Sequence, residues 1–267
     1  MATLKRINNV KIHVVPTCKP TDPTKIRGYD LCPEPYANFF LVARKNSGKT
    51  NLIYNMIKSF ASKKTHVVVM AGTHNNDSTW LYIKRFLDDM GIQNTFHDGL
   101  YGEGKNPVNR VTELIQYMRE STGDSGTSSE HQSAVDRILG VAKPRERKEK
   151  KIAPRFLVIL DDLSSKELRS KPVETLLKSN RHVFSKVVLS SQYIDLSPGS
   201  RDNIDMFVIF KGLNAEKVGV LYENMHLEIS FERFLELYKV ATEKKYDFML
   251  VDVNNQAFRR NFDHLLT

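Results

Sequence analysis

The residues best suited to chemistry are Gly48, Lys49 and Thr50, which follow an apolar run and precede a helical pattern. Backbone N–H groups in such a loop, with the positive end of the next helix, form a cage for phosphate oxygens. Lys49 would reach the β- and γ-phosphates of a nucleoside triphosphate, and the Thr50 hydroxyl would ligate Mg²⁺. The residues predicted to bind nucleotide are Ala43, Arg44, Lys45, Asn46, Ser47, Gly48, Lys49, Thr50 and Asn51.

The first position of this loop departs from the usual pattern, which opens with glycine, because the chain has Ala43 there. Alanine fits the position only if its backbone φ stays negative. Gly48 is explained by the close approach of backbone to phosphate. The triplet alone is weak support, since it should occur by chance in roughly one chain of this size in ten. The flanking strand and helix patterns strengthen it.

A second chemical feature is the pair Asp161 and Asp162, which ends a run of five apolar residues, 156–160. Such a run is typical of a strand buried on both faces. Asp161 would hold Mg²⁺ through water, and Asp162 would orient or deprotonate an attacking water. The alternative is a buried strand followed by an acidic helix cap, because Ser164 and Ser165 also suit a helix start. The loop upstream favours the hydrolytic interpretation.

Alternating strands and helices must position these residues. Such alternation predicts an α/β fold with a mostly parallel sheet and helices on both faces, in which ligands bind at the carboxyl ends of the strands. The expected strands cover residues 38–42, 65–72, 156–160, 186–191 and 206–210, and the expected helices cover 51–60, 80–90, 108–120, 173–178 and 231–242.

We expect two parts in the chain, an extended N-terminal arm over residues 1–35 and a single domain over 36–267. The arm contains a short β-like run at 10–15. The segment 121–154 is rich in polar and charged residues and predicts a flexible insertion, with one or two helical turns at 135–142. A hairpin turning at Asn254 and Asn255 is expected near the end.

Composition bounds the class of protein. No stretch approaches eighteen uninterrupted apolar residues, and the first residues lack the apolar core of a secretory signal, so we expect no membrane span and an intracellular setting. Cys18 and Cys32 are too few for a disulfide framework. The formal net charge of +9 indicates a polyanionic partner, most simply nucleic acid. The basic run 143–151 fits that role or a solvated linker equally well.

Five short stretches together resemble a known family. They are the loop at 43–50, the acidic strand end at 157–162, Asn180-Arg181-His182, Ser190-Ser191-Gln192, and Pro198 with Arg201 and Asn203. In order and spacing they resemble the viral genome-packaging ATPases of the FtsK/HerA superfamily, such as the poxvirus-type packaging ATPase and its relatives in large DNA viruses, virophages and Polinton-like elements. The resemblance covers about residues 38–212.

The resemblance implies a P-loop NTPase of the additional-strand type (ASCE, RecA-like), in which one strand lies between those bearing the phosphate loop and the acidic pair. It implies ATP and Mg²⁺ as cofactors and Gln192 as a polar sensor of the γ-phosphate. Taken alone, Gln192 at a strand end would be interpreted as an exposed loop amide. Asp162 stands where many members of the family carry glutamate.

The family also implies a homo-oligomeric ring, a pentamer or hexamer, with ATP at each subunit boundary. Arg201, or else Arg181, would reach the neighbour's ATP. Such a ring would move double-stranded DNA into a capsid, independently of sequence, and would dock on capsid proteins. It would act in the virion and the host-cell cytoplasm.

Two alternatives share the phosphate loop. A P-loop small-molecule kinase would need an arginine-rich lid, and the basic linker is too poor in apolar residues to form one. A scaffold that binds nucleotide without hydrolysis is suggested by Ala43.

Overall fold

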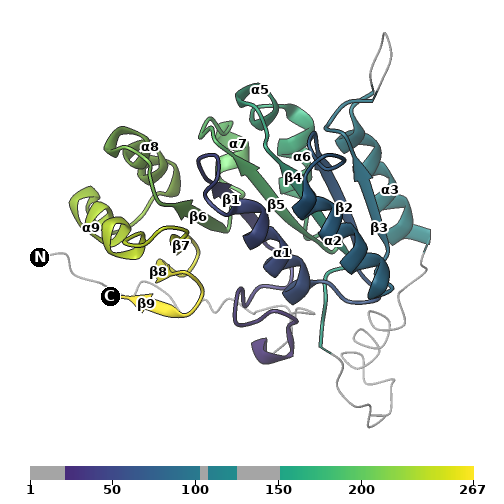
Figure 1. Cartoon of the computed structure of the whole chain (residues 1–267), viewed down its shortest axis with the longest axis horizontal. Helices are drawn as coiled ribbons and strands as arrows, with labels where there is room; N and C mark the ends of the chain where they lie inside the picture. The colour runs from purple at the N-terminus through teal and green to yellow at the C-terminus, as the bar shows by residue number, and fades with distance from the viewer. Residues whose placement is uncertain (1–21, 103–107, 125–150) are drawn as a thin grey trace, which may run out of the picture.

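A computed structural model describes residues 22–102, 108–124 and 151–267 of the chain. In these residues one nine-stranded sheet carries helices on both faces (Figure 1). The strands are β1 (Asn38–Val42), β2 (His66–Ala71), β3 (Asn94–His97), β4 (Phe156–Asp161), β5 (Ser185–Ser191), β6 (Met206–Phe210), β7 (Phe248–Asp252), β8 (Ala257–Arg260) and β9 (His264–Leu266).

The order of the strands across the sheet is β3-β2-β4-β5-β1-β6-β7-β8-β9. Every pair from β3 to β6 is parallel, and every pair from β6 to β9 is antiparallel. β5 therefore lies between β1, which leads into the phosphate loop, and β4, which carries the acidic pair. The predicted fold class, an α/β P-loop fold with an additional strand and a mostly parallel sheet, is confirmed.

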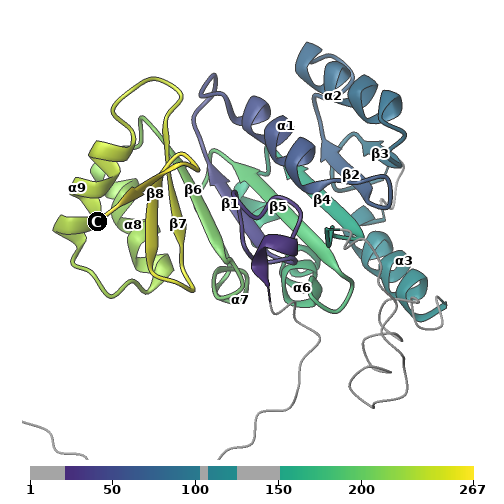
Figure 2. The same cartoon turned by 90° about the horizontal axis from the view of Figure 1, so that it is seen from below.

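Helices complete the two outer layers. They are η1 (Pro23–Lys25, a 3₁₀ turn), α1 (Lys49–Phe60), α2 (Ser78–Asp89), α3 (Arg110–Asp124), α5 (Ser165–Leu168), α6 (Lys171–Ser179), α7 (Pro198–Arg201), α8 (Ala215–Met225) and α9 (Phe231–Ala241). Figure 2 shows α1 and α2 on one face of the sheet and α3 and α6 on the other. Among the described helices, none has the length and apolar character needed to cross a membrane.

Successive side chains along the central strands point to opposite faces of the sheet and pack into two hydrophobic cores. In β1, Phe39 and Leu41 pack in the cluster that contains the buried sides of α1 and α2. Phe40 and Val42 belong to the opposite cluster, with α3, α6, α8 and α9. Because both faces are covered, these strands read as continuous apolar runs in the sequence.

The end of the chain extends the sheet, and several of its elements were not predicted. The hairpin of β7 and β8 forms as expected, pairing Asp252 with Ala257 across the turn at Asn254 and Asn255. The short strands β3 and β9 and the helices α7 and α8 were not predicted. α5 begins at Ser165 with Ser164 as its N-cap, where the alternative interpretation of the acidic pair placed a helix start. β9 is largely exposed, so its sequence lacks the apolar run that identifies a buried strand.

Two predicted boundaries need correction. α3 continues to Asp124, so the first residues of the 121–154 segment are helical. At its other end Ile152 pairs with Ile26, and the Thr65 hydroxyl donates to the Pro154 carbonyl at 2.8 Å, which fixes those residues on the domain. The helical turns predicted at 135–142 and the β-like run at 10–15 lie outside the described residues.

The described end of the N-terminal arm differs from the extended chain that we predicted. Residues 22–35 form the 3₁₀ turn η1 and then pack on the domain. Ile26 and Cys32 are buried there, with 3% and 0% of their surfaces exposed. Apolar burial therefore ties this part of the arm to the sheet.

Candidate active site

The predicted site lies at the carboxyl edge of three adjacent strands. Val42 pairs with Ser191 across β1 and β5, and Leu160 pairs with Leu189 across β4 and β5. This register places the residues that follow the three strands side by side. They are Ala43 after β1, Asp162 after β4 and Gln192 after β5.

The phosphate loop has the backbone that its sequence requires. Asn46 and Gly48 have positive φ angles of 60° and 90°, and α1 starts directly after Gly48. Ala43 is not among the described residues with positive φ, so alanine is accommodated at the first loop position. Its N–H donates to the Ser191 carbonyl at 3.1 Å, which ties the start of the loop to β5.

Three side chains converge at this edge. Lys49 Nζ lies 3.3 Å from Asp161 Oδ1 and 3.3 Å from Asp162 Oδ1. Gln192 Nε2 donates a hydrogen bond to Asp162 Oδ1 at 3.2 Å. The structure thus brings together the loop lysine, both carboxylates and the strand-end glutamine, although Gln192 alone resembled an exposed loop amide.

The two carboxylates differ in environment. The side chain of Asp161 is 5% exposed, whereas that of Asp162 is 50% exposed. Partial burial raises the pKa of Asp162, but Lys49, the Gln192 amide and Lys45 together bring it below the ordinary value. Asp162 is therefore ionised at neutral pH. A carboxylate with a lowered pKa is a weak base, so this environment favours orienting a water over removing its proton.

Two buried polar atoms at the site have no hydrogen bond within the described residues, Ser47 Oγ and Asp161 Oδ1, and of the two Asp161 Oδ1 has the ion pair with Lys49. Buried polar groups are normally satisfied, so such atoms call for a ligand or water. Thr50 and Asn51 lie in the first turn of α1, next to the loop. This donor set suits nucleotide phosphates with a hydrated Mg²⁺, which would be held by Thr50 and Asp161.

A supporting layer that the sequence did not reveal links β5 to the acidic strand. Ser191 Oγ donates to the Leu163 carbonyl at 2.5 Å, and the Leu163 N–H donates to the Ser190 carbonyl at 3.0 Å. The Tyr193 N–H donates to Ser191 Oγ at 2.9 Å. These bonds fix Gln192 relative to Asp162. The only signal in the sequence was a pair of serines before the glutamine.

A cavity of about 190 Å³ lies next to the phosphate loop, and the sequence did not predict it. The loop before β7 forms one wall, and Tyr246 Cδ1 lies 3.2 Å from the position that a Cβ on Gly48 would occupy. The lining residues are Arg44, Lys45, Asn46, Ser47, Phe210, Lys211, Lys245 and Tyr246.

The two arginines predicted to act between subunits are not brought to the phosphate loop of their own chain. Arg181 and Arg201 precede β5 and β6, so they lie at the opposite, amino edge of the sheet. Arg181 pairs with Asp205 at 3.1 Å. Arg201 Nη1 donates to Asn224 Oδ1 at 3.0 Å, while its buried Nε has no hydrogen-bond partner within the described residues.

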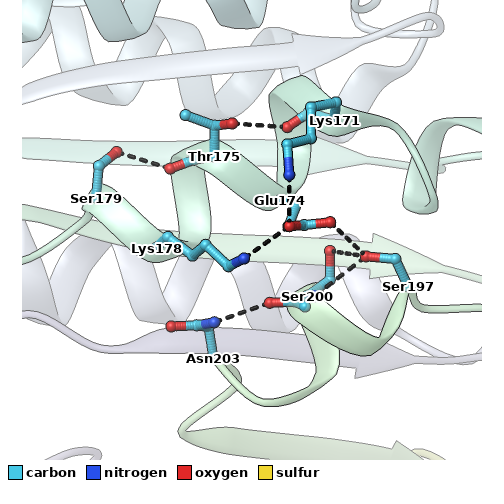
Figure 3. A network of polar contacts seen from close by, with 9 residues as sticks. Lys171, Glu174, Thr175, Lys178, Ser179, Ser197, Ser200 and Asn203 are labelled. Atoms are coloured by element: carbon cyan, nitrogen blue, oxygen red, sulfur yellow. Dashed lines mark hydrogen bonds and ion pairs between the residues drawn. The ribbon is translucent and has the colours of Figure 1, made fainter.

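A polar network holds the turn that carries Arg201 (Figure 3). Glu174 on α6 accepts from Lys171 at 2.9 Å, from Lys178 at 2.7 Å and from Ser197 Oγ at 3.1 Å. Ser197 is also the N-cap of α7. Hydrogen bonds from Lys178 and Lys171 lower the pKa of Glu174 to about 2. The ionised carboxylate therefore ties α7 to α6 at neutral pH.

The fold and the loop together are those of the P-loop NTPase class of the additional-strand type. The strand order, the loop with its lysine, the acidic pair and the strand-end glutamine all follow that class.

Comparisons with known proteins agree with this class. The family model described as "Poxvirus A32 protein" matches residues 132–261, a segment that includes the acidic pair and Gln192. The genome packaging NTPase B204 from Sulfolobus turreted icosahedral virus 2, solved with AMP, has 18% identity and a TM-score of 0.54 over 85% of this chain and 98% of that chain. The same NTPase solved with AMPPCP has 19% identity and a TM-score of 0.54, over 88% of this chain and 100% of that chain.

None of the curated proteins compared with the chain matches it. The likeness to B204 is one of fold, and the family model adds a match in sequence over the second half of the chain. The resemblance to the poxvirus-type viral packaging ATPases, which the motifs predicted, is confirmed.

Proposed function

We propose that this protein is an ATP-hydrolysing motor that moves double-stranded DNA into a viral capsid. The observation that carries the proposal is the convergence of Lys49, Asp162 and Gln192, with separations of 3.3 and 3.2 Å, at the carboxyl edge of the sheet. The match to the poxvirus family and the fold shared with a genome packaging NTPase support packaging as the process that the hydrolysis drives.

In this proposal the chain's own residues bind the nucleotide and place the attacking water. The backbone of residues 43–50 and the N-terminus of α1 cradle the phosphates. Lys49, now paired with the two carboxylates, turns to the β- and γ-phosphates. Asp162 and Gln192 share a hydrogen bond and together orient the water. Mg²⁺, held by Thr50 and Asp161, supplies charge neutralisation when bound.

The oligomer is part of the same proposal. Arg201 and Arg181 lie at the amino edge, away from their own phosphate loop, and so act only if a neighbouring subunit presents them in a ring. Arg201 is our first candidate, because the Glu174 network holds its helix firmly. A positioned arginine stabilises charge on the transferred phosphoryl group.

DNA and capsid proteins are the proposed partners. The net charge of +9 suits contacts to DNA phosphates, which are independent of sequence and weaken with salt. Docking on capsid proteins would place the motor in the virion and in the host-cell cytoplasm during assembly.

The test is ATP hydrolysis with and without double-stranded DNA, at low and moderate salt. We expect DNA to stimulate turnover in a salt-sensitive way, and Lys49→Ala and Asp162→Asn to abolish it. Matched controls are Lys58→Ala, an exposed lysine on the same helix, and Asp89→Asn, an exposed carboxylate on α2. ATP that binds but stays intact under every condition would contradict the motor, and phosphate transfer to a small acceptor would favour a kinase.

A further inference from the structure

The turn that precedes β7 presents an aromatic ring beside the phosphate loop. Tyr246 has a φ of 73°, in the left-handed region, which is strained for a residue with a Cβ. The residue is nevertheless 57% exposed, and its ring contacts the position where Gly48 would carry a Cβ. An exposed aromatic ring on a strained backbone points to function, since burial of the ring does not explain the strain.

The turn is built to hold this conformation. Asp247 accepts hydrogen bonds from the Lys244 N–H at 3.2 Å, from Asn261 Nδ2 at 3.1 Å and from Arg260 Nη2 at 2.7 Å. Lys211 Nζ donates to the Glu243 carbonyl, which joins the turn to the end of β6. The backbone on both sides of Tyr246 is thus held by hydrogen bonds to the rest of the domain.

The cavity beneath Tyr246 is the right size for part of a nucleotide. Its volume of about 190 Å³ is smaller than the roughly 300–1,000 Å³ typical of sites that enclose a whole small-molecule ligand. Four of its lining residues, 44–47, also belong to the phosphate loop. A molecule whose phosphates occupy the loop can therefore place its other end in the cavity.

The residues that line the cavity indicate which chemical group of the bound molecule would enter it. Tyr246 offers a flat aromatic face, and Lys245 Nζ already lies 4.8 Å from the centre of its ring. Arg44, Lys45 and Lys211 add further N–H donors, and none of the eight lining residues carries a carboxylate. An aromatic face with surrounding donors fits a heteroaromatic ring whose nitrogens accept hydrogen bonds.

We infer that Tyr246 and Lys245 form a binding site for the purine base of the nucleotide whose phosphates bind at the loop. The inference rests on the proposed function and adds to it the residue that stacks on the base. Because donors line the cavity, adenine and guanine are both accepted through their ring nitrogens, and discrimination between them is weak.

The test compares the binding of ATP with that of inorganic tripolyphosphate, both with Mg²⁺, by calorimetry on the whole chain. Base stacking on an aromatic side chain is strong enough that Tyr246→Ala should weaken ATP binding about tenfold. Tripolyphosphate binding should change by less than about twofold, since it has no base to stack. Tyr246→Phe should keep the affinity of the parent, and Tyr82→Ala, which removes a tyrosine that is 58% exposed on α2, is the matched control.

Each outcome of this binding test either supports or overturns the proposed base site. A loss confined to ATP supports the base site. An equal loss for ATP and tripolyphosphate in Tyr246→Ala would overturn it, because the ring would then only support the phosphate loop. Unchanged ATP binding in Tyr246→Ala, with ATP still hydrolysed, would overturn the base site and leave the proposed function standing. A parent protein that binds neither compound would overturn both.

Discussion

Gln192 Nε2 lies 3.2 Å from Asp162 Oδ1 and donates a hydrogen bond to it, although thirty positions separate the two residues in sequence. The bond joins the end of the inserted strand β5 to the end of the acidic strand β4. Lys49 Nζ lies 3.3 Å from the same oxygen, so Asp162 Oδ1 contacts both the loop lysine and the strand-end amide. If Lys49 turns to a bound phosphate, its contact with Asp162 changes, and the hydrogen bond between Asp162 and Gln192 is affected as well.

We expect Gln192→Ala to lower the rate of ATP hydrolysis about a hundredfold, because removing one positioned donor typically costs this much. Binding of ATP should change by less than about threefold, since Lys49 and the loop backbone remain. Single-turnover hydrolysis and equilibrium binding separate the two effects. Gln116→Ala, which removes an exposed amide on α3, serves as the control. A variant with parental turnover would show that the Asp162 bond has no catalytic role.

Ala43→Gly tests the one position where the loop departs from the usual pattern. Ala43 is 1% exposed and needs no positive φ, so glycine brings no conformational advantage. We expect the free energy of unfolding to fall by about 0.5–1 kcal/mol through the greater entropy of the unfolded chain. The rate of hydrolysis should stay within about twofold of the parent, because the loop backbone is already suited to phosphate. Denaturant unfolding and steady-state hydrolysis measure both, and a strong gain in hydrolysis would mean that alanine restrains the loop.

Arg201→Ala tests the proposed contact between subunits. We expect hydrolysis to fall about a thousandfold while ATP binding persists, as for loss of an arginine that contacts the phosphoryl group from a neighbour. Mixing this variant with Lys49→Ala should restore part of the rate, because some boundaries then combine an intact loop with an intact arginine.

The control for Arg201 is Asn224→Ala, which removes the hydrogen-bond partner of Arg201 within the chain and keeps the arginine itself. Its rate should stay close to that of the parent. An equal loss in both variants, with no recovery on mixing, would assign Arg201 a purely structural role.

The buried Lys186 leads us to a prediction about the stability of the fold and its dependence on pH. It is fully buried, its Nζ has no hydrogen-bond partner within the described residues, and it lies 3.9 Å from the centre of the Phe60 ring. Burial lowers the pKa of Lys186 from 10.5, so the unfolded chain binds this proton more tightly than the folded one. Stability should therefore rise with pH from the lowered pKa up to the ordinary value.

Lys186→Met keeps an unbranched side chain that is one heavy atom shorter and removes the unsatisfied amine. We expect it to raise the free energy of unfolding at neutral pH by about 1 kcal/mol or more, and to flatten the rise of stability with pH. Urea unfolding at several pH values measures both effects, with Lys63→Met, an exposed lysine, as the control. A destabilised variant would show that the buried amine makes a favourable contact with the aromatic rings.

The elements that could be predicted are those whose signal is local. The phosphate loop needs only Gly48 and Lys49 between an apolar run and a helical pattern, and α1 appears where that pattern places it. Buried central strands such as β4 are continuous apolar runs and were predicted closely. By contrast, β3 is only half-buried and β9 largely exposed, so neither produces such a run.

The sequence by itself determined the class of site, because a phosphate loop and an acidic strand end are built from neighbouring residues with fixed backbone demands. Only the tertiary structure decided which distant residues meet there. The register of β5 between β1 and β4 brings Gln192 to Asp162, and the turn before β7 brings Tyr246 to Gly48. Strand pairing and packing between segments far apart in the chain leave no local pattern, since they depend on the whole sheet closing around its two cores.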